Sequence, residues 1–357
     1  GVQPSEYDPA DPTKGCKKIM DLCRRLLGTG ANGDWGLAWL ADMLQNPESK
    51  PGTALVLRSK EGAGKGTLMN HILGPILRGA YVHIANRKHL TSNFNSILQG
   101  TLLFFVDEAI WAGDKEGEGA LKGLITEPTL MIEGKGKDAF PIANLARIVF
   151  ASNEKWVVPV GPYGRRFHVV DCDEEMAQNI RYFEEVRAEA NNGGREAFMA
   201  YLLNFDTSKF DLRNPPVTDA LVSQKIQTLR SDSVAHWFFE RLYEGALYGA
   251  DDSLANGWPK EITRDRVRAS YASYCKRMNT RHPASAEEIG SFLKEKMGVG
   301  AARASKAGAD GTRPMLYVFK APEEDNVLDA ELERLAYWRG VFEQKMFGGV
   351  YQWPDYH

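Results

Sequence analysis

The chain has 357 residues, of which 43% are hydrophobic and 25% charged, with a formal net charge of −3 at pH 7. This length allows a sizeable core in two or three domains, and the balanced charge means that any nucleic-acid contact must come from local basic patches. The four cysteines form no Cys-x-x-Cys pair, which excludes a disulfide framework and a zinc site and favours a reducing compartment. We expect a cytoplasmic protein without a membrane partner, because no apolar run approaches the ~20 residues that span a bilayer.

The first 51 residues divide into two parts. Residues 1–15 contain three prolines and begin with Gly rather than Met, which predicts a linker in a fragment of a longer protein, with a domain missing upstream. Within residues 16–51, apolar side chains recur at helical spacing in two runs, 16–27 and 35–44. We therefore predict a small helical unit, either a packing cap on the next domain or a functional collar.

A glycine-rich stretch, Ser59–Thr67, follows a short apolar run and precedes a helical pattern. Strand, glycine turn and a helix that begins with Gly-Lys are typical of a phosphate-binding loop, where backbone N–H groups and the helix dipole attract an anion. Lys65 would reach the β- and γ-phosphates. The predicted nucleotide-binding residues are Gly62, Ala63, Gly64, Lys65, Gly66 and Thr67.

Two positions depart from the usual phosphate-loop pattern. Ser59 replaces its first glycine, and Gly66 replaces the Ser or Thr that binds Mg²⁺. Thr67, one place later, is therefore the predicted magnesium ligand. The alternative interpretation is a tight glycine turn before an ordinary helix.

From Thr53 onward, short apolar strands alternate with helices, which predicts an α/β fold with a mainly parallel sheet. One buried strand, Thr101–Glu108, ends in two acids. In an ATPase with a phosphate loop, an acid at this place holds the magnesium ion and a neighbouring Glu polarises water. We assign Asp107 to the metal and Glu108 to the water; the alternative is a strand that ends in solvated acids.

A hairpin is predicted at Thr129–Pro141, where two apolar arms flank a Gly-Lys-Gly-Lys tip. A basic tip can bind a DNA phosphate backbone, so Lys135 and Lys137 are the predicted DNA-binding residues. A solvated charged turn is equally compatible with the spacing.

Two further pieces follow the hairpin. The strand over 147–153 ends in the amide of Asn153, which could bond the γ-phosphate or position water, or serve as a helix cap or Asx turn. Arg165 and Arg166 precede the strand that begins at Phe167. Arginines in this setting suit an arginine finger, which stabilises charge on the transferring phosphoryl group; the alternative is a basic pair on the surface.

Five pieces follow one another along the chain: the phosphate-binding loop, the strand that ends in two acids, the basic hairpin, the strand that ends in Asn153 and the arginine pair. Their order resembles that in the superfamily 3 helicases, an AAA+ branch found in viruses, phages and plasmids. The stretch 133–140, Glu-Gly-Lys-Gly-Lys-Asp-Ala-Phe, is similar to the B′ hairpin motif of that family. The similarity is greatest to the helicase part of phage and poxvirus-type primase-helicases.

The resemblance implies an AAA+ core and an ATP-driven hexameric ring that moves on single-stranded DNA, with ATP and Mg²⁺ as cofactors. It makes Lys65 the Walker A lysine, Asp107 and Glu108 the Walker B acids, and Asn153 sensor 1. It also implies that the arginine finger, Arg166 with Arg165 as the reserve, comes from a neighbouring subunit.

The remaining chain is assigned from helix patterns and local charge. We predict a phosphate-loop core over 52–173, a helical extension over 174–229, a winged-helix-like domain over 230–321 and an acidic, aromatic tail over 322–357. Residues 260–320 hold 13 Lys and Arg against 6 Asp and Glu. This balance fits nucleic-acid binding or a solvated basic face. The tail could pack on the ring or bind another replication protein.

Two other functions compete with the helicase interpretation. The string Gly-Ala-Gly-Lys-Gly-Thr also resembles the phosphate loop of adenylate kinases, which implies a nucleoside monophosphate kinase-like phosphotransferase. The other competing function is that of a DNA-binding scaffold with an inactive ATPase. Stimulation of ATP turnover by single-stranded DNA distinguishes all three.

Overall fold

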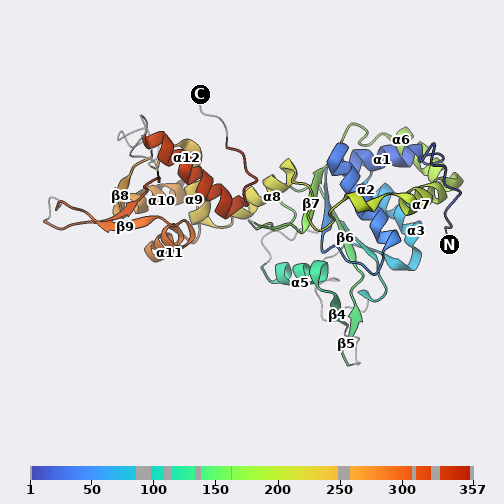
Figure 1. Ribbon diagram of the computed structural model, residues 1–357, viewed down its shortest axis with the longest axis horizontal. Helices are drawn as coiled ribbons and strands as arrows, with labels where there is room; N and C mark the ends of the chain where they lie inside the picture. The colour runs from blue at the N-terminus through green and yellow to red at the C-terminus, as the bar shows by residue number, and fades with distance from the viewer. Residues whose placement is uncertain are drawn as a thin grey trace. The chain divides into compact units, whose positions relative to one another are not determined.

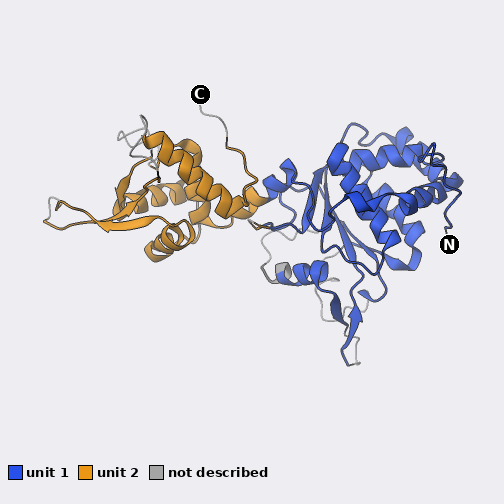
Figure 2. Ribbon diagram, viewed as in Figure 1, with its two compact units in different colours: residues 1–160, 164–224 blue, residues 161–163, 225–357 orange. Residues whose placement is uncertain are grey.

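The computed structural model describes residues 2–85, 98–107, 115–132, 138–161, 163–247, 258–307, 311–322 and 330–353. The chain forms two compact units, shown in Figure 2. Unit 1 comprises residues 1–160 and 164–224, and unit 2 comprises residues 161–163 and 225–357. No helix in the described ranges combines the length and the apolar character needed to cross a bilayer.

Unit 1 is built on a five-stranded sheet in which all strands are parallel (Figure 1). The strand order is β2-β3-β6-β1-β7, so β1 lies between β6 and β7. A parallel sheet requires crossover connections and is covered on both faces, which explains the nearly continuous apolar runs of these strands. The strands are β1 (Ala54–Arg58), β2 (Tyr81–Ile84), β3 (Leu103–Asp107), β6 (Arg147–Ser152) and β7 (Phe167–Asp171).

Alternate side chains of the strands enter two separate cores. Leu55 and Leu57 of β1 belong to the core shared with one set of helices, whereas Ala54 and Val56 belong to the opposite core. The first set comprises α1 (Lys17–Leu27), α2 (Gly30–Gln45), η1 (Thr67–Leu73), α3 (Gly74–Leu77), α6 (Ile180–Glu189), η4 (Ala190–Gly194) and α7 (Arg195–Asn204). The opposite core is covered by α5 (Lys115–Thr126), by α8 (Asp219–Leu229) and by a two-stranded hairpin, β4 (Thr129–Ile132) and β5 (Phe140–Ala143).

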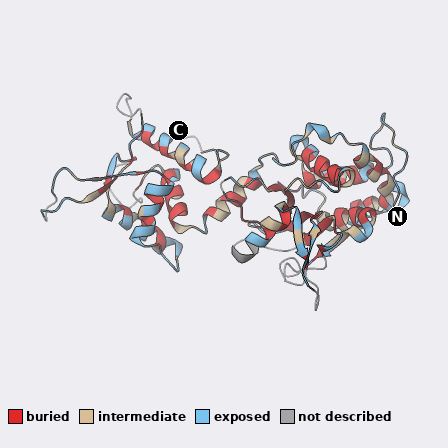
Figure 3. Cartoon of the chain, turned by 60° about the horizontal axis from the view of Figure 1, so that its bottom comes forward, coloured by how far each residue is buried: buried red, intermediate tan, exposed pale blue. Residues whose placement is uncertain are grey.

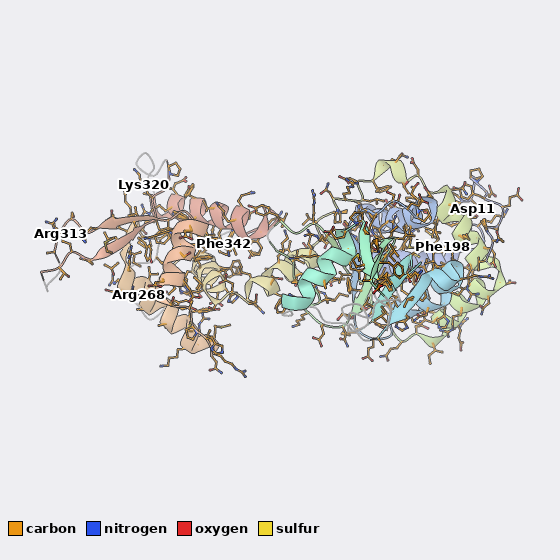
Figure 4. The ribbon with its side chains drawn as sticks, turned by 90° about the horizontal axis from the view of Figure 1, so that it is seen from below. Asp11, Phe198, Arg268, Arg313, Lys320 and Phe342 are labelled. Carbon is orange, nitrogen blue, oxygen red and sulfur yellow. The ribbon has the colours of Figure 1, made fainter. Side chains whose placement is uncertain are left out.

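Unit 2 has a smaller antiparallel sheet of order β8-β10-β9. Its core is aromatic, with Trp237, Phe238 and Trp258 fully buried. Figure 3 shows buried residues on the helices of both units, and Figure 4 labels one buried phenylalanine of each, Phe198 and Phe342. The elements are α9 (Ser233–Glu244), β8 (Glu261–Thr263), α10 (Arg264–Met278), α11 (Ala286–Ser291), η6 (Phe292–Lys296), β9 (Gly300–Arg303), β10 (Met315–Val318), α12 (Ala330–Phe342) and η8 (Glu343–Phe347).

The α/β class and the mainly parallel sheet predicted from the sequence are confirmed. The structure adds three local details. Helix α10 begins at Arg264, because residues 261–263 pair with β10 as strand β8. Helix α8 lies within the helical extension predicted over 174–229. The aromatic residues of the predicted tail are largely core, since Trp338, Phe342 and Phe347 are buried in unit 2.

Candidate functional site

The glycine-rich loop connects the end of β1 to η1, as a phosphate-binding loop would. Gly62 and Gly64 have φ of +81° and +98°, a region that favours glycine. A Cβ at Gly62 would lie 2.7 Å from Cγ of Gln178, and one at Gly64 would lie 2.6 Å from Cε1 of Phe183. Both glycines are therefore required by the backbone conformation and by the close approach of the segment that leads into α6.

Lys65 folds back onto the start of its own loop. Its Nζ donates to the carbonyl oxygen of Ser59 at 2.9 Å, to Ser59 Oγ at 2.6 Å and to the carbonyl oxygen of Lys60 at 3.1 Å. Burial lowers the pKa of Lys65, although nearby groups that include Asp107 act in the opposite direction. The serine that departs from the usual pattern thus supplies an acceptor for the lysine, and an anion in the site would compete for the same ammonium group.

The second departure, Gly66, is sterically open. Its φ is −63°, and a Cβ built there finds no atom closer than Asn70 Nδ2 at 3.7 Å. A larger side chain would therefore fit, and glycine is not required for the turn. Gly66 and Thr67 both line the cavity beside Lys65, so Thr67 supplies a hydroxyl at the place where a metal ion could bind.

The ends of three parallel strands bring the other predicted residues to this loop. Asp107 of β3 is in register with Ala151 of β6, which is in register with Leu57 of β1. Because parallel strands share their carboxyl edge, Asp107, Asn153 and the loop after β1 meet at one edge of the sheet. Asp107 is partly exposed, with its Oδ2 3.9 Å from Nε2 of His83.

These residues surround one cavity of about 490 Å³. That volume lies within the range of small-molecule sites. Lys65, Thr67, Asp107 and Asn153, which were predicted from three separate motifs, all line it. The full lining is Glu61, Gly62, Ala63, Gly64, Lys65, Gly66, Thr67, Asn70, His71, Asp107, Ser152, Asn153, Gln178, Ile180, Phe183 and Arg187.

Helix α6 supplies the part of the lining that the motifs did not indicate. Ile180, Phe183 and Arg187 lie at i, i+3 and i+7, so one face of the helix is turned to the cavity. No ion pair or side-chain hydrogen bond of Arg187 is recorded with the described residues. Arg187 is therefore a second cation at the cavity besides Lys65. Its helical spacing from Ile180 was the only signal in the sequence that could have indicated it.

The predicted arginine finger does not reach this cavity within its own chain. Arg166 directly precedes β7, and its carbonyl oxygen accepts from the N–H of Ala54 at the amino edge of the sheet. The glycine-rich loop lies at the carboxyl edge, one five-residue strand away, or about 13 Å. Arg165 is exposed and donates to Asn214 Oδ1 at 3.4 Å, while the buried Nε of Arg166 has no partner among the described residues.

Three predicted site residues, Glu108, Lys135 and Lys137, lie outside the described residues. The arms of the hairpin that carries the two lysines are present, with Leu130 in register with Ile142. Figure 1 shows this β4–β5 hairpin projecting from the rest of unit 1. Met131 is 56% exposed and Phe140 40% exposed on its stem.

The donors for a metal ion are few. In the part of the chain that the structure describes, no group of three or more His, Cys, Asp or Glu side chains could hold one. Asp107 and Thr67 supply one carboxylate and one hydroxyl at the same cavity. This sparse set fits Mg²⁺, which is usually held by one or two protein ligands together with phosphate oxygens and water.

Comparison with known proteins gives one family and one relative. A family model described as "Family of unknown function (DUF5906)" matches residues 57–166, a range that runs from β1 to Arg166. A curated relative, the "DNA Primase-polymerase" of Nitratiruptor phage NrS-1, is 27% identical over 248 residues. The match covers 64% of this chain and 33% of the relative. The chain is thus homologous to this primase-polymerase and spans about a third of its length.

Solved structures of the same phage protein share the fold. "The apo structure of NrS-1 C terminal region (305-718)" has a TM-score of 0.62 and 18% identity, and the match covers 89% of this chain and 77% of that one. A second structure, titled "The A form apo structure of NrS-1 C terminal region-CTR(305-718)", has a TM-score of 0.61, 19% identity and the same coverage. This chain therefore has the fold of the C-terminal region of its relative.

Proposed function

We propose that unit 1 is a magnesium-dependent ATPase of the superfamily 3 (AAA+) helicase type, which acts in DNA replication as a ring, of six subunits by analogy, on single-stranded DNA. The observation that carries the proposal is the convergence of Lys65, Thr67, Asp107 and Asn153 on one cavity. These residues come from three separate segments of the sequence. Their meeting at the carboxyl edge of a parallel sheet is the usual position of a ligand in such folds.

Each residue has a distinct task in this proposal. The N–H groups of Gly62, Ala63 and Gly64 have no recorded acceptor among the described residues, so they are available to bind phosphate oxygens. Lys65 would exchange its bonds to Ser59 and Lys60 for the β- and γ-phosphates. This exchange moves the ammonium group from neutral carbonyl and hydroxyl oxygens to anionic ones, where charge-assisted hydrogen bonds are roughly twice as strong.

The remaining tasks concern the metal and the water. Thr67 and Asp107 would hold Mg²⁺, which when bound neutralises charge on the phosphate oxygens. Asn153, exposed at the end of β6, would bond the γ-phosphate or orient the attacking water. The sequence places Glu108, the residue proposed to polarise that water, directly after Asp107. Phosphoryl transfer depends mainly on such positioning and electrostatic stabilisation.

The position of Arg166 supports a site shared between subunits. Because Arg166 lies at the opposite edge of its own sheet, it could act only on the nucleotide of a neighbouring subunit. A head-to-tail contact of this kind is heterologous, and it forms a ring when the rotation between successive subunits closes. ATP hydrolysis would then require assembly.

The first test is nucleotide binding by the full chain, with a fluorescent ATP analogue and Mg²⁺. Lys65→Ala should weaken binding by about tenfold or more, since a hydrogen bond to a charged group contributes about 1.5–3 kcal/mol. Lys60→Ala is the matched control, because Lys60 lies in the same loop, is 84% exposed and is not among the residues that line the cavity. Equal affinity for the wild type and Lys65→Ala would contradict the proposal.

The second test separates a DNA motor from other nucleotide-dependent enzymes. Single-stranded DNA should stimulate ATP turnover, and Lys135→Ala with Lys137→Ala should abolish the stimulation without weakening ATP binding. Turnover that ignores DNA and requires a nucleoside monophosphate as acceptor would instead identify a small-molecule phosphotransferase.

A further inference from the structure

The chain order and sheet order of unit 2 together describe a recognisable arrangement. Helix α9 is followed by strand β8, by the helix pair α10 and α11, and by the hairpin β9–β10. The last strand, β10, lies in the middle of the sheet, between β8 and β9. A helix pair backed by a three-stranded sheet with a projecting hairpin is the layout of a winged helix-turn-helix, in which the second helix of the pair usually enters the DNA groove.

The helix that would enter the groove is poorly suited to that role. Residues 286–296, which form α11 and η6, hold three acidic residues and two lysines. Glu288 is bound in the capping box of Ser285, and Lys296 lies 3.6 Å from Asp232. Glu287 is exposed in the first turn, where it would face phosphate with like charge. The affinity of nucleic-acid contacts comes mainly from neutralised phosphates, so this helix offers little.

The β9–β10 hairpin, in contrast to α11 and η6, is basic. Residues 298–320 contain four basic residues and one acid. Arg303, Lys306 and Arg313 are exposed, and no ion pair of any of them is recorded with the described residues. Figure 4 shows Arg313 toward the projecting end of the hairpin, away from Phe342 in the helical part of unit 2. These three residues are called the wing cations below.

The pairing of the hairpin brings two of the wing cations close together. Met315 is in register with Arg303, and the N–H of Ala304 donates to the carbonyl oxygen of Pro314 at 2.9 Å. Arg303 and Arg313 are thus diagonal neighbours across the hairpin, a spacing of about 7–8 Å between backbone positions. Three of the four residues that follow Arg303 have small side chains (Ala304, Ser305 and Ala307), which lets a neighbouring backbone approach closely.

The surroundings of the wing cations favour a duplex over a single strand. Proteins that bind single strands add exposed aromatic rings on which bases stack. The aromatic residues of this hairpin, Tyr317 and Phe319, are buried in the core of unit 2. The hairpin therefore presents positive charge to a ligand, without exposed aromatic rings.

We propose that unit 2 binds the phosphate backbone of duplex DNA through the β9–β10 hairpin, with Arg303, Lys306 and Arg313 as the contacts, rather than through α11. This interaction goes beyond the ATPase and does not require nucleotide. It gives the chain a contact with duplex DNA that is separate from the single-strand contact proposed for Lys135 and Lys137.

The test is equilibrium binding of the full chain to a fluorescent blunt-ended DNA duplex, without nucleotide, from about 50 to about 200 mM salt. The background carries Lys135→Ala and Lys137→Ala, so that the hairpin of unit 1 does not contribute. Replacing the three wing cations with Ala should weaken binding and reduce the slope of log K against log salt by up to about 2.7, or about 0.9 for each lost phosphate contact.

Two further variants make the result specific. Arg303→Lys with Arg313→Lys keeps the charge and should retain the wild-type slope, which also controls for folding. Lys294→Ala, an exposed lysine on η6, should leave affinity and slope unchanged. The proposal is overturned if the triple Ala variant binds duplex as tightly as its background, if Lys294→Ala causes the loss instead, or if the loss appears with single-stranded DNA only.

Discussion

The two glycines that flank Lys65 should respond in opposite ways to the same substitution. Gly64→Ala places a methyl group 2.6 Å from Phe183 Cε1 and 2.8 Å from Leu22 Cδ1, at a φ of +98°. Neither neighbour can give way easily, because both side chains are buried in the core of unit 1. Gly66→Ala places the same methyl group at ordinary contact distance, 3.7 Å from Asn70 Nδ2, at an ordinary helical φ.

The expected magnitudes follow from these geometries. A left-handed conformation costs a residue with a Cβ about 1–2 kcal/mol, and overpacking a core costs about 1–3 kcal/mol. Gly64→Ala should therefore lower the free energy of unfolding of unit 1 by about 2–5 kcal/mol. Gly66→Ala should leave it unchanged or raise it by up to about 1 kcal/mol, because Ala is favoured over Gly within a helix.

Hydrogen exchange read by mass spectrometry is the suitable assay, because peptides from unit 1 can be followed separately from those of unit 2. Loss of protection across Leu68–Leu73 should accompany Gly64→Ala, and ATP should restore less of it than in the wild type. Gly66→Ala should retain both protection and ATP binding. Wild-type protection in Gly64→Ala, or equal loss in the two variants, would refute the loop geometry described above.

Two other predictions concern charged groups of unit 1. Arg187→Ala should weaken ATP binding by about tenfold or more in a titration with labelled ATP. Arg181→Ala on the same helix should have no effect, because the Arg181 side chain is 90% exposed and paired with Glu185. Equal effects of the two substitutions would show that Arg187 is not part of the site. Burial lowers the pKa of Lys50 to about 7 from an ordinary 10.5. Between these two pH values the unfolded state therefore binds more protons than the folded state. The free energy of unfolding of the wild type should rise with pH in this range, by at most about 1.4 kcal/mol per pH unit. Denaturant unfolding of Lys50→Met should lack this rise, and a parallel pH dependence in the two proteins would contradict the assignment.

The sequence predicted the carboxyl edge of the sheet better than its surroundings. A buried strand that ends in a polar residue is visible in the amino-acid order, and Asp107 and Asn153 both lie where that pattern placed them. The positions of two glycines were equally informative, because positive φ restricts the residue type. Local chemistry of this kind does not depend on which segments later pack together.

What the sequence could not indicate depends on long-range packing. Arg187 belongs to no motif, and it reaches the cavity only because α6 packs against the glycine-rich loop. One of the most buried residues of α8 is polar, so its hydrophobic pattern does not indicate which residues pack in the core. Gln224 is fully buried and accepts a hydrogen bond from the N–H of Val157 at 2.8 Å. A hydrophobic pattern does not predict a contact of this kind.

A mixing experiment tests the central claim of a site shared between subunits. Lys65→Ala and Arg166→Ala are each measured for DNA-stimulated ATP hydrolysis alone, and then as an equimolar mixture. Each variant alone should be inactive. If Arg166 acts on the neighbouring subunit, random mixing places an intact loop beside an intact arginine at about a quarter of head-to-tail interfaces, and activity should return toward that fraction of the wild-type rate. A mixture as inactive as its two components, or an Arg166→Ala variant with the full wild-type rate, would contradict the account.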